Sequence, residues 1–244
     1  MQIVIDQGNT FIKVAIFDKD EIISVNRYDV LDKSLIDEIA GKYSITHGII
    51  SSVGDRSKIH TDAFSNHGIK IIELSSKTPL PIGNNYSTPQ TLGVDRLALA
   101  VGANSLSPNQ NLLVVDMGTC ITADHVGSSN AFEGGVISPG MMMRFKAMHE
   151  HTARLPLLSP PESSIPVIGK STVEAMSSGV MNGMALELEG YRKRIEEENG
   201  KVLLYLTGGD AKYFQQQFKD NFVYEPNLLF IGLKKILDHN SERI

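Results

Sequence analysis

The sequence contains a single cysteine, Cys120, among 244 residues. One cysteine excludes an intramolecular disulfide and a cysteine-rich zinc site, which fits a reducing compartment. No apolar run approaches the roughly 18 residues that a membrane-spanning helix needs. The first residues enter a strand-like pattern without the basic segment of a signal peptide. We therefore expect a cytoplasmic protein that does not have a membrane partner.

Positive charge is also scarce, since 23 Lys and Arg against 28 Asp and Glu give a formal net charge of −5. Nucleic-acid binding needs clustered Lys and Arg, so this balance argues against a nucleic-acid partner. What is present is an ordinary globular composition, with 41% hydrophobic and 21% charged residues. That composition excludes wholesale disorder. The length fits one large domain or two domains of roughly 100–150 residues.

One pattern occurs twice, about 110 residues apart. An apolar run, an aspartate, a glycine turn and a second apolar run occur around Asp6–Thr10 and again around Asp116–Thr119. A single turn of this kind is usually only structural, so the repeat carries the interpretation. We interpret it as a duplicated strand-turn-strand unit. It predicts an α/β fold of two similar lobes, residues 1–111 and 112–244, with mixed β-sheets flanked by helices.

Helical and strand-like patterns fill the rest of the chain. Ser171-Thr172-Val173-Glu174 matches a capping box and starts the longest predicted helix. The patterns predict helices over 31–39, 93–104, 140–152, 171–198 and 228–238 and one after residue 211, strands over 48–53, 69–74 and 202–206, and loops over 78–91 and 155–169.

The first glycine turn has the residue types that a magnesium-bound phosphate chain requires. Gly8 lets backbone N–H groups approach a phosphate closely, because it has no Cβ and tolerates positive φ. Asn9 and Thr10 supply further donors, and Lys13 can reach a phosphate. Asp6, at the end of the preceding strand, can hold Mg²⁺ directly or through water.

The second turn repeats these residue types. Gly118 and Thr119 can contact phosphate, and Asp116 supplies a second oxygen ligand. A third glycine turn, Thr207-Gly208-Gly209, follows a predicted strand and precedes a predicted helix, a position suited to backbone contact with a nucleoside. Taken alone, this third turn is equally well explained as an ordinary helix start. Together the three turns predict that the protein binds ATP.

These parts, in this order, resemble the acetate-kinase/hexokinase/Hsp70/actin superfamily. Gly93-Val94-Asp95-Arg96, with Tyr86 before it and the glycine-rich run 134–140 after it, further resembles type III pantothenate kinase. The resemblance extends over essentially the whole chain. It implies an ATP-dependent kinase that converts pantothenate to 4′-phosphopantothenate, the first step of coenzyme A biosynthesis. It also implies a homodimer that uses Mg²⁺ and needs K⁺ or NH₄⁺.

The resemblance implies roles for individual residues, of which Asp95 would be the catalytic carboxylate. The residues expected to contact pantothenate are Tyr86, Gly93, Val94, Asp95, Arg96 and Thr172. Those expected to hold ATP are Asp6, Gln7, Gly8, Asn9, Thr10, Phe11, Ile12, Lys13 and Thr119, with Gly208 and Gly209 on the nucleoside side. Asp116 would help to bind the monovalent cation.

The chemistry of Asp95 and Arg96 agrees with these roles, because a carboxylate can orient and deprotonate an alcohol and a guanidinium matches the carboxylate of pantothenate bidentately. Outside this context, the pair is better explained as an ordinary helix start with an acidic first turn. Two positions depart from the family pattern. Cys120 stands where alanine is usual, and we interpret it as a small buried residue; Gly54-Asp55 replaces Val-Pro.

Two other functions stay open. One is a non-catalytic accessory protein of transcription with the same fold, and the other is a phosphatase or ATPase of the superfamily. Retention of Asp6, Asp95, Asp116 and Thr119 favours an enzyme over the first. The Gly-x-Asp-Arg segment argues against the second, because it resembles that of pantothenate kinases, whose phosphoryl acceptor is an alcohol and not water.

Overall fold

The computed structural model describes residues 1–8, 11–52, 58–161, 165–215, 217–218 and 222–241. The chain divides into two compact units, the first made of Met1–Leu106 and Asn227–Ile244 and the second of Ser107–Pro226. This division differs from the predicted lobes of 1–111 and 112–244. The boundary lies a few residues earlier, and the last segment of the chain returns to the first unit.

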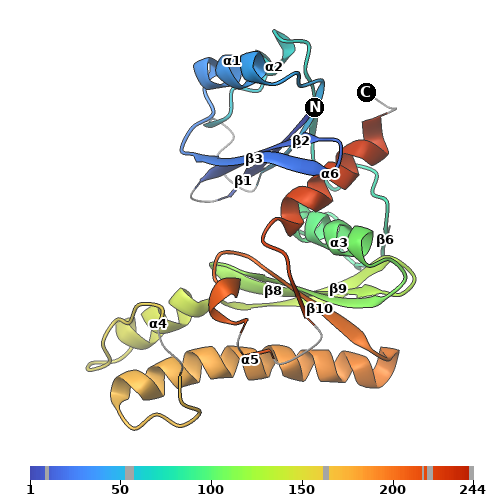
Figure 1. Ribbon diagram of the computed structural model, residues 1–244. Coiled ribbons are helices and arrows are strands. Elements are labelled where there is room, and N and C mark those ends of the chain that lie inside the picture. Colours follow the sequence, from blue (N-terminus) through green and yellow to red (C-terminus); the bar gives the residue numbers. More distant parts are fainter. Residues whose placement is uncertain (9–10, 53–57, 162–164, 216, 219–221, 242–244) are drawn as a thin grey trace. The chain divides into compact units, whose positions relative to one another are not determined.

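The first unit contains a mixed sheet with the strand order β3-β2-β1-β4-β5, of which Figure 1 labels β1, β2 and β3. Strand β1 is antiparallel to β2 and parallel to β4. The bounds are β1 Gln2–Gln7, β2 Ile12–Asp18, β3 Glu21–Tyr28, β4 His47–Ser52 and β5 Lys70–Glu73, with helices α1 Lys33–Lys42 and α2 Asp62–Ser65. Asp32 caps α1 by accepting the Leu35 N–H at 2.9 Å. Ile36 and Ile39 of this helix are buried, in one core cluster with Ile3 and Ile5 of β1.

Helices α3 (Val94–Leu106) and α6 (Leu228–Asn240) belong to the same unit, as does the short strand β6 (Gly83–Asn84). The two helices pack backbone to backbone. A Cβ on Gly232 would collide with the Ala98 carbonyl, and one on Gly102 would collide with the Leu228 carbonyl. Two glycines, one on each helix, therefore permit a contact that joins segments more than 100 residues apart.

An ion-pair network fixes α6 to the first sheet. The ammonium group of Lys234, a residue with only 6% of its surface exposed, donates to Asp20 at 2.8 Å and to Asp238 at 2.7 Å. Asp238 also accepts from the Gln2 amide at 3.0 Å. Burial alone would lower the pKa of Lys234, but the two carboxylates more than offset it and raise that pKa. These contacts explain why the last helix belongs to the first unit.

The second unit repeats the strand order of the first, as β9-β8-β7-β10-β11. Strand β7 is antiparallel to β8 and parallel to β10, as β1 is to β2 and β4. The bounds are β7 Asn111–Met117, β8 Cys120–Gly127, β9 Ala131–Pro139, β10 Val202–Thr207 and β11 Phe222–Tyr224, with helices α4 Met141–Glu150 and α5 Thr172–Asn199. The predicted duplication and the α/β class with mixed sheets are confirmed.

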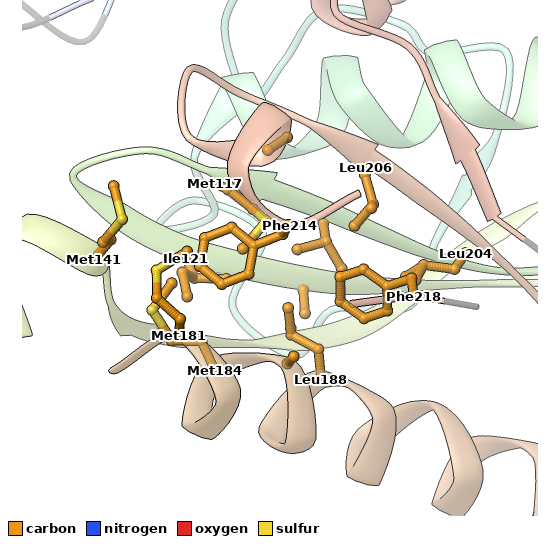
Figure 2. Packing of buried hydrophobic residues seen from close by; sticks show 14 of the residues in the cluster. Met117, Ile121, Met141, Met181, Met184, Leu188, Leu204, Leu206, Phe214 and Phe218 are labelled. Atoms are coloured by element: carbon orange, nitrogen blue, oxygen red, sulfur yellow. The ribbon is translucent and has the colours of Figure 1, made fainter. Parts of the chain in front are cut away.

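The core of the second unit lies between its sheet and α5, which runs along one face of that sheet (Figure 1). Met181, Met184 and Leu188 of α5 point toward residues of the sheet (Figure 2). The predicted capping box of α5 is present, because Ser171 Oγ accepts the Glu174 N–H at 3.2 Å. The Glu174 carboxylate accepts the N–H of Lys170 at 2.7 Å, one residue before the position that a capping box prescribes.

Two expectations were wrong. The helix predicted after the third glycine turn is a single 3₁₀ turn, Ala211–Tyr213, closed by i to i+3 hydrogen bonds such as the 3.0 Å bond from Tyr213 N–H to the Asp210 carbonyl. Cys120 is exposed rather than buried, because it opens β8 and points away from the core face, to which Ile121 contributes. In the described ranges, no helix combines the length and apolar character that crossing a membrane requires.

Candidate functional site

Asp6 lies near the end of β1, beside Lys13 on β2 and Ser51 on β4 in the register of the sheet. Its neighbours Ile3 and Ile5 face the core under α1, so strand alternation turns Asp6 to the opposite face. Burial raises the pKa of Asp6 to about 6; Lys13 opposes this shift and the charge of Asp95 adds to it. A buried acid with a second acid nearby is typical of a functional site.

The glycine turn after Asp6 is closed by the Gly8 N–H, which donates to the Phe11 carbonyl at 3.1 Å. Gln7 is buried, and its side-chain oxygen accepts the Ser52 hydroxyl at 2.7 Å. Ile12 lies in the core, so only its backbone can contact a ligand. The positions of Asn9, Thr10, Gly54 and Asp55 lie outside the described residues.

The segment expected to bind pantothenate forms the start of α3. Asp95 lies in the first turn and accepts the N–H of Arg96 at 2.8 Å. Its carboxylate fills the space where a side chain on Gly93 would lie, which explains the glycine. The guanidinium of the buried Arg96 lies 5.8 Å from the centre of the Tyr86 ring, at cation–π distance. The first unit therefore brings Tyr86, Gly93, Asp95 and Arg96 together, with Val94 as the first helical residue.

The second glycine turn has the same arrangement in the second unit. Asp116 lies near the end of β7, beside Thr122 on β8 and Thr207 on β10. The Gly118 N–H donates to the Cys120 carbonyl at 3.0 Å and closes the turn. Thr119 is exposed, so a ligand can reach its hydroxyl.

The third glycine turn packs against the end of β7. Gly208 has a φ of +92°, and a Cβ there would collide with Asp116 and with the backbone of Met117. The Asp210 N–H donates to the Met117 carbonyl at 2.9 Å. Gly209 is open, with nothing within 4 Å of the place that a Cβ would take. Only Gly208 is therefore required by the geometry of the turn.

A cavity of about 580 Å³ opens beside the second and third glycine turns, and its volume is within the usual range for small-ligand sites. Its lining comes from the turns, from α4 and from the residue that follows α4: Gly118, Thr119, Met142, Met143, Lys146, Ala147, Glu150, His151 and Asp210. Burial raises the pKa of the Asp210 carboxyl, and Lys212 opposes this shift. The α4 residues could not be identified from the sequence, because nothing in the pattern of that helix separates a cavity wall from a solvated face.

Two further residues were missed, and both lie beside the paired aspartates. The hydroxyl oxygens of Ser51 and Thr122 are buried and have no hydrogen-bond partner. Buried polar atoms are nearly always satisfied, so these two atoms, one on the parallel neighbour of β1 and one on the antiparallel neighbour of β7, are candidates for bonding to a ligand or its water. Polar residues directly after the apolar run 49–50 were the signal for Ser51.

The described residues contain no group of three or more His, Cys, Asp and Glu side chains that would hold a metal ion. Mg²⁺ in phosphoryl transfer is usually bound by one or two carboxylates together with substrate phosphates, so Asp6 fits such a role without a cluster. Asp116 fits a cation with oxygen ligands, because the orphaned Thr122 hydroxyl is beside it in the sheet. Thr172 is exposed at the start of α5 in the second unit, whereas the other expected pantothenate residues belong to the first.

The chain matches known proteins along its full length. The family model described as type III pantothenate kinase matches residues 2–194. The type III pantothenate kinase of Phocaeicola vulgatus is 40% identical over 242 residues, which cover 99% of this chain and 100% of the relative. That of Bacteroides fragilis (strain ATCC 25285) is 37% identical over 244 residues, with 100% of both chains covered.

Solved structures agree on the fold. A Campylobacter jejuni protein provisionally assigned to the Baf family of transcriptional activators has a TM-score of 0.65 at 25% identity, with 98% of this chain and 99% of that chain covered. The activator of 2-hydroxyisocaproyl-CoA dehydratase from Clostridium difficile, with bound ADPNP, has a TM-score of 0.56 at 14% identity, with 99% and 96% covered. Because the family model and the full-length relatives both match, this chain belongs to the type III pantothenate kinase family.

Proposed function

We propose that this chain transfers the γ-phosphoryl group of ATP to pantothenate, which gives 4′-phosphopantothenate and ADP in the first step of coenzyme A biosynthesis. Family membership supports the reaction and its substrates. The observation that carries the site assignment is the neighbourhood of Asp6 and Asp95 in one unit, where the charge of Asp95 adds to the raised pKa of Asp6. Asp6 is then available for the phosphate donor, ATP, and Asp95 for the acceptor, pantothenate.

Asp95 is the catalytic carboxylate in this proposal. It orients the acceptor hydroxyl of pantothenate and takes its proton as the new bond from oxygen to the γ-phosphorus forms. The bond from that phosphorus to the bridging oxygen breaks, and ADP leaves with the electron pair. The exposure of Asp95 is intermediate, so a substrate can reach it.

Arg96 and Tyr86 hold the acceptor. The guanidinium of Arg96 pairs with the carboxylate of pantothenate, and the ring of Tyr86, over which the guanidinium lies, holds it by a cation–π contact. Gly93 and Val94 contact pantothenate through the backbone at the start of α3. Thr172 contributes its exposed hydroxyl from the start of α5.

ATP is held by the residues that follow β1 and β7. Residues from Asp6 to Lys13 and the Thr119 hydroxyl contact the phosphate chain, while Gly208 and Gly209 lie on the nucleoside side. The open surface at Gly209 and the cavity beside Thr119 support this assignment. The ammonium of Lys13, next to Asp6 in the sheet, contributes positive charge.

Two cations complete the proposed site. Asp6 binds Mg²⁺, directly or through water, and Asp116 helps to bind K⁺ or NH₄⁺. When bound, these ions neutralise part of the charge on the phosphate chain. The orphaned hydroxyls of Ser51 and Thr122, which lie beside the two aspartates, support oxygen-rich sites at both positions.

We also propose that the protein is a homodimer and acts in the cytoplasm, where ATP is plentiful. Large apolar side chains exposed on the second unit support a partner surface, among them Ile137 on β9, 65% exposed, and Leu186 on α5, 71% exposed. A non-catalytic accessory role in transcription and a phosphatase or ATPase activity are not favoured, because the full-length curated relatives carry the name of a kinase.

The experiment that tests this function is ADP release on addition of pantothenate with Mg²⁺, with K⁺, with NH₄⁺ or with neither. Release that needs pantothenate and increases with either monovalent cation is expected. ADP release at the same rate without pantothenate would indicate an ATPase, and no turnover under any cation would contradict the proposal.

A further inference from the structure

Arg144, in the first turns of α4, joins three elements of the second unit. Its Nε donates to the carbonyl of Pro139 at 2.8 Å, and its Nη2 donates to Ser138 Oγ at 2.8 Å. The same Nη2 donates to Glu187 Oε2 of α5 at 2.6 Å. One guanidinium therefore links α5 to the last two residues of β9.

The residue after Ser138 and Pro139 is Gly140, and it supports the second phosphate turn. The Gly140 N–H donates to the Thr119 carbonyl at 3.1 Å. A Cβ on Gly140 would collide with the carbonyl oxygens of Gly118 and Thr119, so the two backbones are in direct contact. A shift of the corner formed by residues 138–140 must therefore move Gly118 and Thr119 with it.

An ordinary ion pair does not explain this arrangement. The Arg144 and Glu187 side chains are 22% and 27% exposed, so water still screens the pair and its own contribution to stability is modest. Two of the three bonds of Arg144 go to the corner, and a planar guanidinium is the side chain that can make all three at once. The helix itself is held by Met141 and Phe145, both fully buried. Arg144 is therefore available for a task other than keeping α4 in place.

We propose that Arg144 is a positioning residue for the phosphate donor: it holds the corner of residues 138–140, and through Gly140 it fixes Thr119 in the geometry that binds ATP. This inference rests on the proposed function of Thr119. Met142 and Met143, directly before Arg144, line the cavity next to Thr119, so the same anchor also fixes one cavity wall. The role of Glu187 is to orient the guanidinium.

The test compares four variants by their affinity for a non-hydrolysable ATP analogue, measured by calorimetry, and by their kinetic constants. Arg144→Met is expected to weaken analogue binding and to raise the KM for ATP about tenfold, from the loss of charged hydrogen bonds, with kcat and the KM for pantothenate nearly unchanged.

Arg144→Lys should bind the analogue almost as weakly, because an ammonium group cannot make the fork-shaped set of hydrogen bonds of a guanidinium. Glu187→Gln should keep near wild-type affinity, because the amide oxygen still accepts. Ser138→Ala should weaken binding two- to threefold, about the loss of one bond.

Arg192→Met is the matched control. Arg192 pairs with Glu189 at 3.0 Å with a similar exposure of 19%, but lies on α5 outside the corner. Its substitution should leave analogue affinity unchanged. Unchanged affinity in Arg144→Met, or an equal loss in Glu187→Gln or Arg192→Met, would overturn the proposal. If Arg144→Met does not fold, Arg144→Lys and Ser138→Ala decide by the same criterion. Because analogue binding needs no turnover, the absence of pantothenate kinase activity would contradict the proposed function and leave this test intact.

Discussion

Asp6 and Asp116 occupy equivalent positions in two sheets of the same strand order. Each lies near the end of the first strand of its unit, with an antiparallel neighbour on one side and a parallel neighbour on the other. Beside each of them lies a buried hydroxyl without a partner, Ser51 next to Asp6 and Thr122 next to Asp116. The two aspartates are therefore equivalent in the duplication, whereas the two hydroxyls are not, because Ser51 lies on a parallel neighbour and Thr122 on an antiparallel one.

Asp6→Asn is expected to stabilise the protein at neutral pH. The pKa of Asp6 is raised to about 6 in the folded state from 3.8, so the native protein holds a proton that the unfolded chain has lost between about pH 4 and 6. Stability therefore falls as pH rises through this window. Asparagine, which stays neutral, should add about 2 to 3 kcal/mol to the free energy of unfolding at pH 8 and almost nothing at pH 4.

Denaturant unfolding at pH 4, 6 and 8 measures this difference. Asp6→Asn should also lose turnover, because it removes the carboxylate that is proposed to bind Mg²⁺ at the ATP site. A gain in stability that is equal at pH 4 and pH 8 would show that Asp6 has an ordinary pKa.

Asp95→Asn is expected to lower kcat by at least about 100-fold, the usual contribution of a general base, while the protein still binds the ATP analogue. Asp18→Asn, at an exposed position at the end of β2, is the control and should keep full activity. Steady-state kinetics and calorimetry on both variants give the comparison. Activity near that of the wild type in Asp95→Asn would remove this residue from the reaction.

Arg96→Met is expected to weaken binding of pantothenate selectively. Loss of a bidentate pair with a carboxylate should raise the KM for pantothenate by about 10- to 100-fold. A pantothenate amide, which lacks the carboxylate, should show nearly the same KM with either protein. An equal loss for both acceptors would indicate that Arg96 supports the fold of α3 and does not read the carboxylate.

Gly208→Ala is expected to damage the second unit. A side chain there must accept a φ of +92° and must displace Asp116 or the Met117 backbone, at a combined cost of about 2 to 5 kcal/mol. Gly209→Ala, in the next position, meets nothing within 4 Å and should be tolerated. Thermal melts should show a fall in Tm of at least about 4 °C for the first variant only. Similar melting temperatures for the two would contradict the packing of this turn.

Gly232→Ala tests whether the last helix belongs to the first unit. The added methyl group would collide with the Ala98 carbonyl of α3, and we expect a loss of about 1 to 3 kcal/mol. Gly190→Ala, on α5 with open space around it, should instead stabilise the protein by up to about 1 kcal/mol. Urea unfolding of both variants checks the sign. A stabilising Gly232→Ala would mean that α6 does not pack closely on α3.

The sequence predicted the parts of the fold that depend on local pattern. The repeat around Asp6 and Asp116 predicted two similar sheets, and the capping box at Ser171 predicted the start of α5. The return of α6 to the first unit was not predictable from periodicity. It depends on the close contact of α3 and α6 at Gly102 and Gly232, and the whole second unit lies between these two residues in the sequence.

The candidate site was predicted unevenly for the same reason. Asp6, Asp95 and Asp116 stand in motifs, so their residue types and order identified them. Ser51 and Thr122 became candidates only through strand register, which places them beside those aspartates. Arg144 lies in a stretch of methionines whose pattern says nothing of hydrogen bonds to residues five and six positions earlier in the chain.

The most direct measurement is mass spectrometry of the products formed by the purified protein with pantothenate, ATP, Mg²⁺ and K⁺. We predict that pantothenate gains one phosphoryl group in step with the ADP produced, and that Asp95→Asn forms almost none of this product. Pantothenate that remains unmodified while the protein is folded and binds nucleotide would contradict the assignment of this chain as a pantothenate kinase.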